Sequence, residues 1–300
     1  LNIQRQSGRS PSLPAKVFPI LSLGMVAISA GSILVRFSQE APSLAIAFYR
    51  MLWATVILFP FFWHRREPLS HYLRWEYAAA GIALALHFAF WIHSLRFTSV
   101  AVSVLLVNTS PVLVALLSFF FFRERLTRRG ILGLASSVIG ASVLFWNDLE
   151  DLGDWRGPVY AGLGALAVGC YLISGRSLRR NTDLINYVFP TYACAAAVLG
   201  LAVLTTGTPW RGFSWETHGF LLLLGLVPQV LGHTSYNWAL GFLSATVVST
   251  LILVEPILAT LFAWWILDET VSGMILIGGV LVGTGIFLIS HRGIASQKEV

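Results

Sequence analysis

Ten continuous apolar runs divide the chain, and each is long enough to cross a lipid bilayer as an α-helix. A span needs about 20 predominantly apolar residues. Runs of this kind lie at about 17–37, 43–63, 75–95, 100–122, 130–147, 157–176, 184–206, 216–237, 244–267 and 272–290. A membrane β-barrel would instead show alternating segments of about ten residues. The pattern therefore predicts an all-α integral membrane protein with ten transmembrane helices and short connecting loops.

The fourth and fifth runs recur as the ninth and tenth. When residues 95–145 are placed on 240–290 without a gap, eleven of the 51 positions are identical. The most telling matches are Pro111/Pro256, Glu124/Glu269, Gly133/Gly278 and Gly140/Gly285. Each half holds five predicted spans, and an odd number inserts the two halves with opposite orientation. Such inverted repeats enclose the midplane binding site of many secondary transporters, so a central cavity is expected between them.

This repeat divides the chain into five predicted parts. They are a cytoplasmic N-terminal segment (1–16), a first five-helix repeat (17–147), an outer linker (148–156), an inverted second repeat (157–290) and a cytoplasmic tail (291–300). The linker is acidic up to Asp154, which suits a seam between repeats on the outer side of the membrane.

Composition and charge placement agree with the membrane assignment. Hydrophobic residues make up 56% of the chain and charged residues 11%, against roughly 25% charged in soluble domains. With the N-terminus inside, fifteen of the 20 Lys and Arg fall on the cytoplasmic side, four fall outside, and one, Arg50, lies within a span. Cytoplasmic loops of membrane proteins carry this excess. Both termini are therefore predicted to be cytoplasmic, and the net charge of +6 does not indicate nucleic-acid binding.

Several short motifs resemble a known family. They are Ser99-Val-Ala-Val, Pro111, Arg123-Glu124-Arg-Leu, Gly133 and Gly140, the second-repeat set Glu255-Pro256, Asp268-Glu269, Gly278 and Gly285, and Arg50 in Phe48-Tyr-Arg. Together they resemble the paired EamA domains of the drug/metabolite transporter (DMT) superfamily. The resemblance implies a ten-helix exporter of small metabolites in the bacterial inner membrane. Within the superfamily the chain looks most like the bacterial amino-acid exporters, including the aromatic amino acid exporters.

The eighth span carries a stripe of polar residues. Gln229, His233, Tyr236 and Asn237 follow the spacing i, i+4, i+7 and i+8, which places them on one face of an α-helix. Such a stripe either faces a water-filled cavity or makes hydrogen bonds to neighbouring helices. Both interpretations stay open, and all four residues are substrate-cavity candidates.

Other spans add candidates for the same cavity. His87 and Trp91 lie at i and i+4 in the third span, and an imidazole beside an indole suits an aliphatic or aromatic side chain better than a sugar phosphate. A structural histidine is the alternative. Spans one and six are equivalent in the two repeats and are expected to face each other. This adds Ser32 and Tyr171 to the predicted cavity.

Ionisable residues and prolines near the middle of spans complete the candidate site. Glu255 is a mid-span carboxylate that could bind a substrate ammonium, carry a coupling proton or serve the fold. Asn108 occupies the matching place beside Pro111, and Pro111 and Pro256 are the predicted bending points. Arg50 could hold a carboxylate or a structural partner.

These residues favour a secondary transporter that exports small amino acids or similar metabolites by alternating access. One alternative is a nucleotide-sugar or sugar-phosphate exchanger, but phosphates need more cations than one buried arginine, and both lysines lie outside the spans. Another is an integral membrane enzyme, which would need clustered His, Asp or Glu. No catalytic residue, metal site or cofactor is expected. Proton coupling and the oligomeric state stay open.

Overall fold

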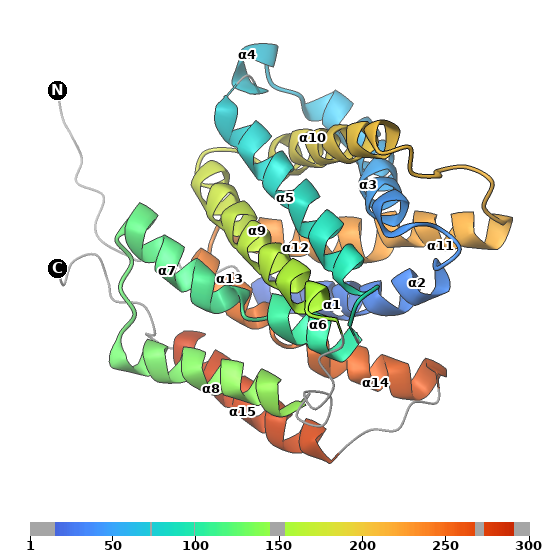
Figure 1. Ribbon diagram of the computed structural model, residues 1–300. Coiled ribbons are helices and arrows are strands. Elements are labelled where there is room, and N and C mark those ends of the chain that lie inside the picture. Colours follow the sequence, from blue (N-terminus) through green and yellow to red (C-terminus); the bar gives the residue numbers. More distant parts are fainter. Residues whose placement is uncertain (1–15, 73, 99, 145–153, 268–272, 291–300) are drawn as a thin grey trace, which may run out of the picture.

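The computed structural model describes residues 16–72, 74–98, 100–144, 154–267 and 273–290 (Figure 1). Residues 1–15, most of the predicted linker (148–153), Glu269 and the tail 291–300 lie outside the described residues. The regular elements within the described ranges are helices, which confirms the all-α fold class.

Each of the ten predicted spans corresponds to helical structure. The first repeat contains α1 (Val17–Ser29) with α2 (Gly31–Phe37), α3 (Ser43–Arg65), the short α4 (Leu69–Tyr72), α5 (Trp75–Ser94), α6 (Val100–Val107) with α7 (Ser110–Phe122), and α8 (Arg128–Leu144). The second contains α9 (Arg156–Arg179), α10 (Leu184–Thr205), α11 (Trp215–Leu224) with the π-helix η2 (Gly225–His233) and α12 (Thr234–Ala239), α13 (Ala245–Ile252) with α14 (Glu255–Leu267), and α15 (Met274–Ser290).

The lengths of these helices fit a membrane protein. Among the described residues, 8 helical segments are long and apolar enough to cross a membrane. The helices α8 and α15, with 17 residues each, occupy the places of the fifth and tenth predicted spans. The structure is thus consistent with the ten-helix prediction.

Helices from the two repeats pair in a pattern that repeats itself. In the first repeat α1 packs against η2 and α12, and in the second the equivalent helix α9 packs against α5. The pairs α3 with α10 and α8 with α15 each join equivalent helices. Figure 1 shows α8 and α15 side by side at one edge of the bundle, with α5 and α9 crossing its centre. Exchanging the repeats leaves this set of pairs unchanged, as an inverted repeat requires.

Glycines allow α8 and α15 to approach closely. A Cβ atom on Gly133 would lie 2.8 Å from the Gly285 carbonyl oxygen, and one on Gly140 would lie 2.8 Å from the Gly278 carbonyl oxygen. The sequence repeat relates Gly133 to Gly278 and Gly140 to Gly285. Gly133 therefore packs against Gly285, which is the repeat equivalent of Gly140, and Gly140 packs against Gly278, which is the repeat equivalent of Gly133. Close helix packing at small residues is common in membranes.

Spans four and nine are broken at the same repeat position. The second half-helices, α7 and α14, begin at Ser110 and Glu255, which are related by the 145-residue offset. Pro111 and Pro256 follow directly, in the first helical turn, where the missing N–H costs no intrahelical hydrogen bond. Both prolines therefore mark the start of a half-helix near the centre of the bundle.

The α8–α15 contact gives a first test of the fold. We expect Gly285→Val to lower the thermal stability of the purified protein, because the new Cβ would lie 2.4 Å from the Gly133 carbonyl oxygen. Overpacking typically costs about 1–3 kcal/mol, and a clash with backbone is harder to relieve. The matched control is Gly283→Val on the same helix, where a Cβ meets nothing within 4 Å. Equal melting temperatures for the two variants, measured by fluorescence-detected size exclusion, would contradict this packing.

Candidate functional site

A small cavity lies at the centre of the bundle, beside the helix breaks. Its space for water-sized molecules is about 40 Å³. Six of the residues predicted from the sequence line it: Arg50, His87, Trp91, Asn108, His233 and Glu255. They come from both repeats, on α3, α5, the α6–α7 break, η2 and α14. Since one water needs roughly 10–15 Å³ of such space, the cavity has room for only a few waters in this conformation.

Arg50 is held in place by two neighbours. Its side chain is 1% exposed, and its Nε donates a 2.9 Å hydrogen bond to Gln229 Oε1. Its guanidinium carbon lies 4.1 Å from the centre of the Phe88 ring, within the range of a cation–π interaction. These contacts fix the guanidinium at the wall of the cavity, where its remaining N–H groups can serve a bound anion.

The α5 wall of the cavity is aromatic and fixed by a backbone contact. His87 Nδ1 lies 3.0 Å from the Gly164 carbonyl oxygen, and because a carbonyl only accepts, Nδ1 carries the proton. The His87 and Trp91 rings are nearly parallel, with an interplanar angle of 4° and centroids 6.2 Å apart. Gly164 lies on α9 directly beside this wall, and a Cβ there would be in ordinary van der Waals contact with Trp91 Cβ at 3.5 Å. The wall offers flat apolar surface beside one imidazole.

The opposite wall is built on a π-helix. Within η2 the backbone follows i→i+5 hydrogen bonding, and Pro228 lies inside it; such segments are often found at functional sites. Gly225 lets η2 pack closely against α3, because a Cβ on Gly225 would lie 2.5 Å from Trp53 Cβ. Gly232 lets η2 pack closely against α1, because a Cβ on Gly232 would lie 3.0 Å from the Ile28 nitrogen. This seating brings His233 to the cavity and Gln229 to Arg50.

The two half-helices meet the cavity at their N-termini. Asn108 and Ser110 flank the start of α7, Glu255 begins α14, and all three line the cavity. A helix N-terminus presents unpaired N–H groups and a partial positive charge. The cavity therefore combines the Arg50 cation, two helix N-termini and the Glu255 carboxylate.

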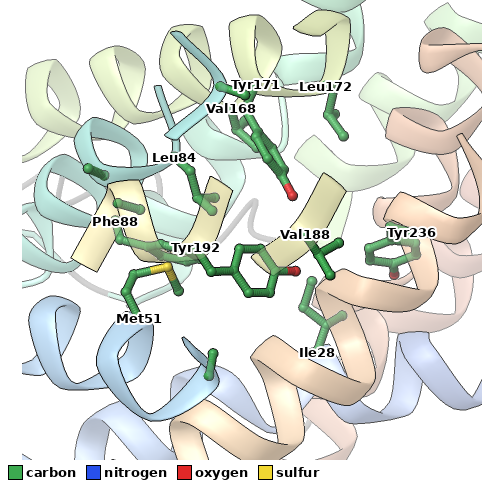
Figure 2. Packing of buried hydrophobic residues seen from close by; sticks show 14 of the residues in the cluster. Ile28, Met51, Leu84, Phe88, Val168, Tyr171, Leu172, Val188, Tyr192 and Tyr236 are labelled. Atoms are coloured by element: carbon green, nitrogen blue, oxygen red, sulfur yellow. The ribbon is translucent and has the colours of Figure 1, made fainter. Parts of the chain in front are cut away.

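The other predicted residues lie around this cavity. Tyr236 is buried and edge-on to His233, with ring centroids 6.5 Å apart. Asn237 Nδ2 donates to the Tyr171 hydroxyl at 2.5 Å and to the Tyr192 hydroxyl at 3.1 Å. In Figure 2 the hydroxyls of Tyr171 and Tyr192 point toward the same part of the core. The polar residues of span eight thus have different partners. His233 lines the cavity, Gln229 binds Arg50, and Asn237 binds Tyr171 and Tyr192.

Below the tyrosine cluster, charged residues close the end of the bundle that the charge pattern predicts to be cytoplasmic. Arg179 Nε donates to the Asn237 carbonyl oxygen at 3.0 Å, and Arg176 donates to the Leu240 carbonyl oxygen at 2.9 Å. Cations suit the free carbonyls at the C-terminus of a helix, here α12. Burial raises the pKa of Glu124 from its usual value, and the positive charges of Arg176 and Arg180 oppose this shift. The hydrogen bonds of Arg176 and Arg179 link α9 to the end of α12.

The other end, predicted to face outside, is hollowed. A pocket of about 630 Å³ there is lined by Ser32, Val35, Arg36, Gln39, Ser43, Ile46, Ile92 and Arg96, among others. Ser32 therefore lies in this outer pocket, whereas Ile28, one turn earlier, lines the central cavity. Ile46 and Ile92, 3% and 1% exposed, lie between the two spaces. The described structure thus has a hollow at the end predicted to face outside, and hydrogen bonds from Arg176 and Arg179 at the end predicted to be cytoplasmic.

Most of the apolar wall was not foreseen from the sequence. Phe88, Ile28, Val168 and Ile252 line the cavity, yet nothing in an apolar span distinguishes such residues from lipid-facing ones. Phe88 alone offered a signal, because it follows His87 on a helix that also carries Trp91.

Two repeats, paired broken helices and a central cavity with polar residues are typical of a multi-pass membrane transporter. The sequence matches the EamA-like transporter family twice, over residues 17–146 and 155–291. The chain belongs to this family, which is part of the drug/metabolite transporter superfamily.

Similar proteins carry transporter names. The YoaV protein of Bacillus subtilis, an uncharacterized transporter, is 21% identical over 83% of this chain and 88% of its own. An uncharacterized transporter of Archaeoglobus fulgidus is 25% identical over 93% and 98%. A probable terminal-alkyne amino-acid exporter of Streptantibioticus cattleyicolor is 30% identical over 65% of each chain. A solved crystal structure has the same fold, with a TM-score of 0.77 at 16% identity over 94% of this chain and 98% of its own. The family and these names indicate a transporter rather than an enzyme.

At the end predicted to face outside, Glu40 links the two repeats by hydrogen bonds. From the α2–α3 loop its carboxylate accepts hydrogen bonds from the Ser214 N–H at 3.0 Å, the Ser214 hydroxyl at 2.7 Å and the Thr217 hydroxyl at 2.5 Å. Ser214 caps α11, so the carboxylate also lies at a helix N-terminus. The Thr217 hydrogen bond, followed by those of Ser214, holds the pKa of Glu40 below its usual 4.5.

This contact predicts a pH-dependent difference in stability. A carboxylate whose pKa is lowered in the folded state contributes stability that is present above the unfolded pKa and lost as pH falls through the folded pKa. The wild type is therefore expected to melt at a higher temperature than Glu40→Gln at neutral pH, and the gap should close below about pH 4. Melting curves of both proteins from pH 8 to pH 3 test this. A gap that persists unchanged at pH 3 would contradict a role for the ionised carboxylate.

Proposed function

We propose that this protein exports small amino acids, or metabolites of the same charge pattern, across a bacterial inner membrane by alternating access. The observation that carries the proposal is the placement of Arg50 and Glu255 on the wall of one central cavity. An amino acid presents one carboxylate and one ammonium group close together, and these two residues supply one complementary charge for each.

The chemistry of the cavity fits a zwitterion with an apolar side chain. The substrate carboxylate would be bound by the Arg50 guanidinium and favoured by the N-terminus of α7. The ammonium would be bound by Glu255. Trp91, Phe88 and Ile28 supply apolar surface for the side chain. Asn108 and His87 add neutral hydrogen-bonding groups, and which of them a substrate engages depends on the particular substrate.

The size of the cavity supports a mechanism in which the walls of the cavity move. Space of about 40 Å³ does not admit an amino acid, so the walls must separate for loading and for release. Release to the outside requires the layer of Ile46 and Ile92 to part. Loading from the cytoplasm requires the hydrogen bonds of Asn237 with Tyr171 and Tyr192 to break. The breaks before α7 and α14 are the places where the helices can bend without losing regular hydrogen bonds.

The similarity to a probable terminal-alkyne amino-acid exporter agrees with this substrate class. A sugar-phosphate exchanger of the same superfamily is the alternative. Among the described residues that line the cavity, Arg50 is the one Lys or Arg. A doubly charged phosphate beside Glu255 would therefore be poorly neutralised.

The test of the proposal is counterflow into proteoliposomes that contain the purified wild type. Radiolabelled phenylalanine, threonine and methionine are offered, with a UDP-sugar and inorganic phosphate as controls, with and without a pH gradient. We expect exchange of at least one amino acid and none of the phosphorylated controls. Exchange of the controls alone would overturn the proposal. A response to the gradient would show proton coupling, and its lack would show facilitated exchange.

Variants of the η2 wall test the site itself. We expect His233→Ala and Gln229→Ala to lower the rate of amino-acid counterflow about tenfold or more, because each removes a hydrogen bond to the substrate or to Arg50. Membrane expression and monodispersity should hold. The control is His64→Ala, an exposed histidine at the end of α3. Transport by correctly inserted His233→Ala and Gln229→Ala at the rate of His64→Ala would remove η2 from the substrate site.

A further inference from the structure

The imidazole of His87 lines the central cavity, and a backbone contact decides which of its nitrogens carries the proton. Its Nδ1 lies 3.0 Å from the Gly164 carbonyl oxygen on α9. A carbonyl only accepts hydrogen bonds, so Nδ1 is a protonated nitrogen. His87 is 5% exposed and belongs to the cavity lining. With Nδ1 turned to α9, Nε2 is the polar atom of this ring that is left for the cavity.

The charged groups of the cavity favour a neutral His87. The guanidinium carbon of Arg50 lies 4.1 Å from the centre of the Phe88 ring, and the centre of the His87 ring lies 4.8 Å from the same point. Arg50 and Glu255 already supply one positive and one negative charge to the cavity wall. A protonated His87 would add a second buried cation, and its desolvation would be costly. Nε2 therefore carries no proton and is a hydrogen-bond acceptor.

Other polar groups of the cavity can either donate or accept. The Asn108 amide and the Ser110 hydroxyl each contain a donor and an acceptor. His233 stands edge-on to Phe88, with an interplanar angle of 73°, and this ring contact does not decide which nitrogen of His233 carries the proton. Groups of this kind adapt to the ligand and discriminate little between ligands. His87 instead offers an acceptor that the backbone of α9 keeps in place.

This acceptor lies on the wall that faces the substrate side chain. The His87 ring is nearly parallel to the Trp91 ring, and further apolar surface comes from Val104, Val107 and Val168. In the proposed function the two charged groups of the cavity bind the carboxylate and the ammonium of the substrate, which leaves the side chain to this wall. Nε2 of His87 is thus a fixed acceptor on a mostly apolar surface.

A fixed buried acceptor separates ligands by whether they carry a hydrogen-bond donor. In the unloaded cavity water can donate to Nε2, since the space of about 40 Å³ has room for a few waters. A substrate side chain displaces this water. An apolar side chain then leaves Nε2 without a partner, which weakens binding. A side chain with a hydroxyl or an N–H replaces the hydrogen bond of the water.

We propose that His87 determines specificity by favouring substrates whose side chain, otherwise apolar, carries one hydrogen-bond donor such as a hydroxyl or an N–H. The inference rests on the proposed amino-acid export and assigns the choice among amino acids to one residue. The charged groups bind the part that all amino acids share, so selection falls on the contacts of the side chain. Threonine is thus preferred over valine, which has the same shape but a methyl group in place of the hydroxyl.

The test compares amino acids of matched shape in proteoliposomes that contain the full chain. Each is an unlabelled competitor against counterflow of a radiolabelled amino acid that the wild type exchanges. We expect threonine to reach half-inhibition at about a tenfold lower concentration than valine. O-methylthreonine keeps the side-chain oxygen but has no donor, and isoleucine has the same shape. These two are expected to inhibit within about twofold of each other.

Variants assign the preference to His87. His87→Phe keeps a flat ring beside Trp91 but removes both nitrogens, so the preference for threonine should fall from about tenfold to about one, while inhibition by valine is kept. His87→Gln retains an oxygen acceptor near the end of the side chain and should restore part of the preference. The control is His93→Phe on the same helix, because the His93 ring packs edge-on against Tyr160 in a separate pocket. This variant should keep the full preference.

Three results would overturn the role of His87. One is equal inhibition of the wild type by threonine and valine, and another is a preference that His87→Phe leaves unchanged. The third is a preference for O-methylthreonine over isoleucine as large as that for threonine over valine, which would show that Nε2 donates. The comparisons on the wild type decide the matter even where His87→Phe fails to insert. Failure of the proposed function is distinct, because the wild type would then show no amino-acid counterflow at all, and the inference would fall with it.

Discussion

The buried guanidinium of Arg50 is the constraint on which the centre of this protein depends. A charge in the middle of a membrane span is costly unless polar groups or water surround it. Here Gln229 Oε1 accepts a hydrogen bond from Arg50 Nε, and the guanidinium lies over the Phe88 ring. The Gln229 contact requires η2 to approach α3, which Gly225 allows. The remaining face of Arg50 needs a polar space, and the central cavity provides it. Arg50 thereby links the π-helix, the close contact at Gly225 and the central cavity.

The inverted repeat explains why the cavity lies where the helices break. Equivalent spans four and nine both stop and restart beside a proline, and the structure brings the two restarts to the same cavity. Free N–H groups of the half-helices would be costly in lipid, so they must face a polar space. The repeats differ in the residue that begins the second half-helix, which is Ser110 in one and Glu255 in the other. A symmetric frame thus holds an asymmetric site.

The spans and their order could be predicted from the sequence because hydrophobic length and the 145-residue repeat are local patterns. The cavity was predicted in part. Arg50, His87 and Glu255 stood out because polar residues are rare in apolar spans, and the structure brings them together. The separation of Gln229 from Asn237 could not be read from the sequence, since helical spacing of 100° per residue assumes an α-helix. The wider turn of η2 arises from its packing against α1 and α3, which involves residues far away in the chain.

The two ends of the bundle are held by different kinds of contact. At the end predicted to be cytoplasmic, Asn237 donates hydrogen bonds to Tyr171 and Tyr192, while Arg179 and Arg176 bind the carbonyl groups that end α12. Toward the outside an apolar layer separates cavity and pocket. Apolar contacts in this layer can slide apart gradually, whereas a hydrogen-bonded cluster opens only when several bonds break together. Because α12 continues directly from His233, a substrate that displaces η2 also displaces Asn237. A shift of η2 at the cavity would therefore be transmitted to the hydrogen bonds of Asn237 with Tyr171 and Tyr192.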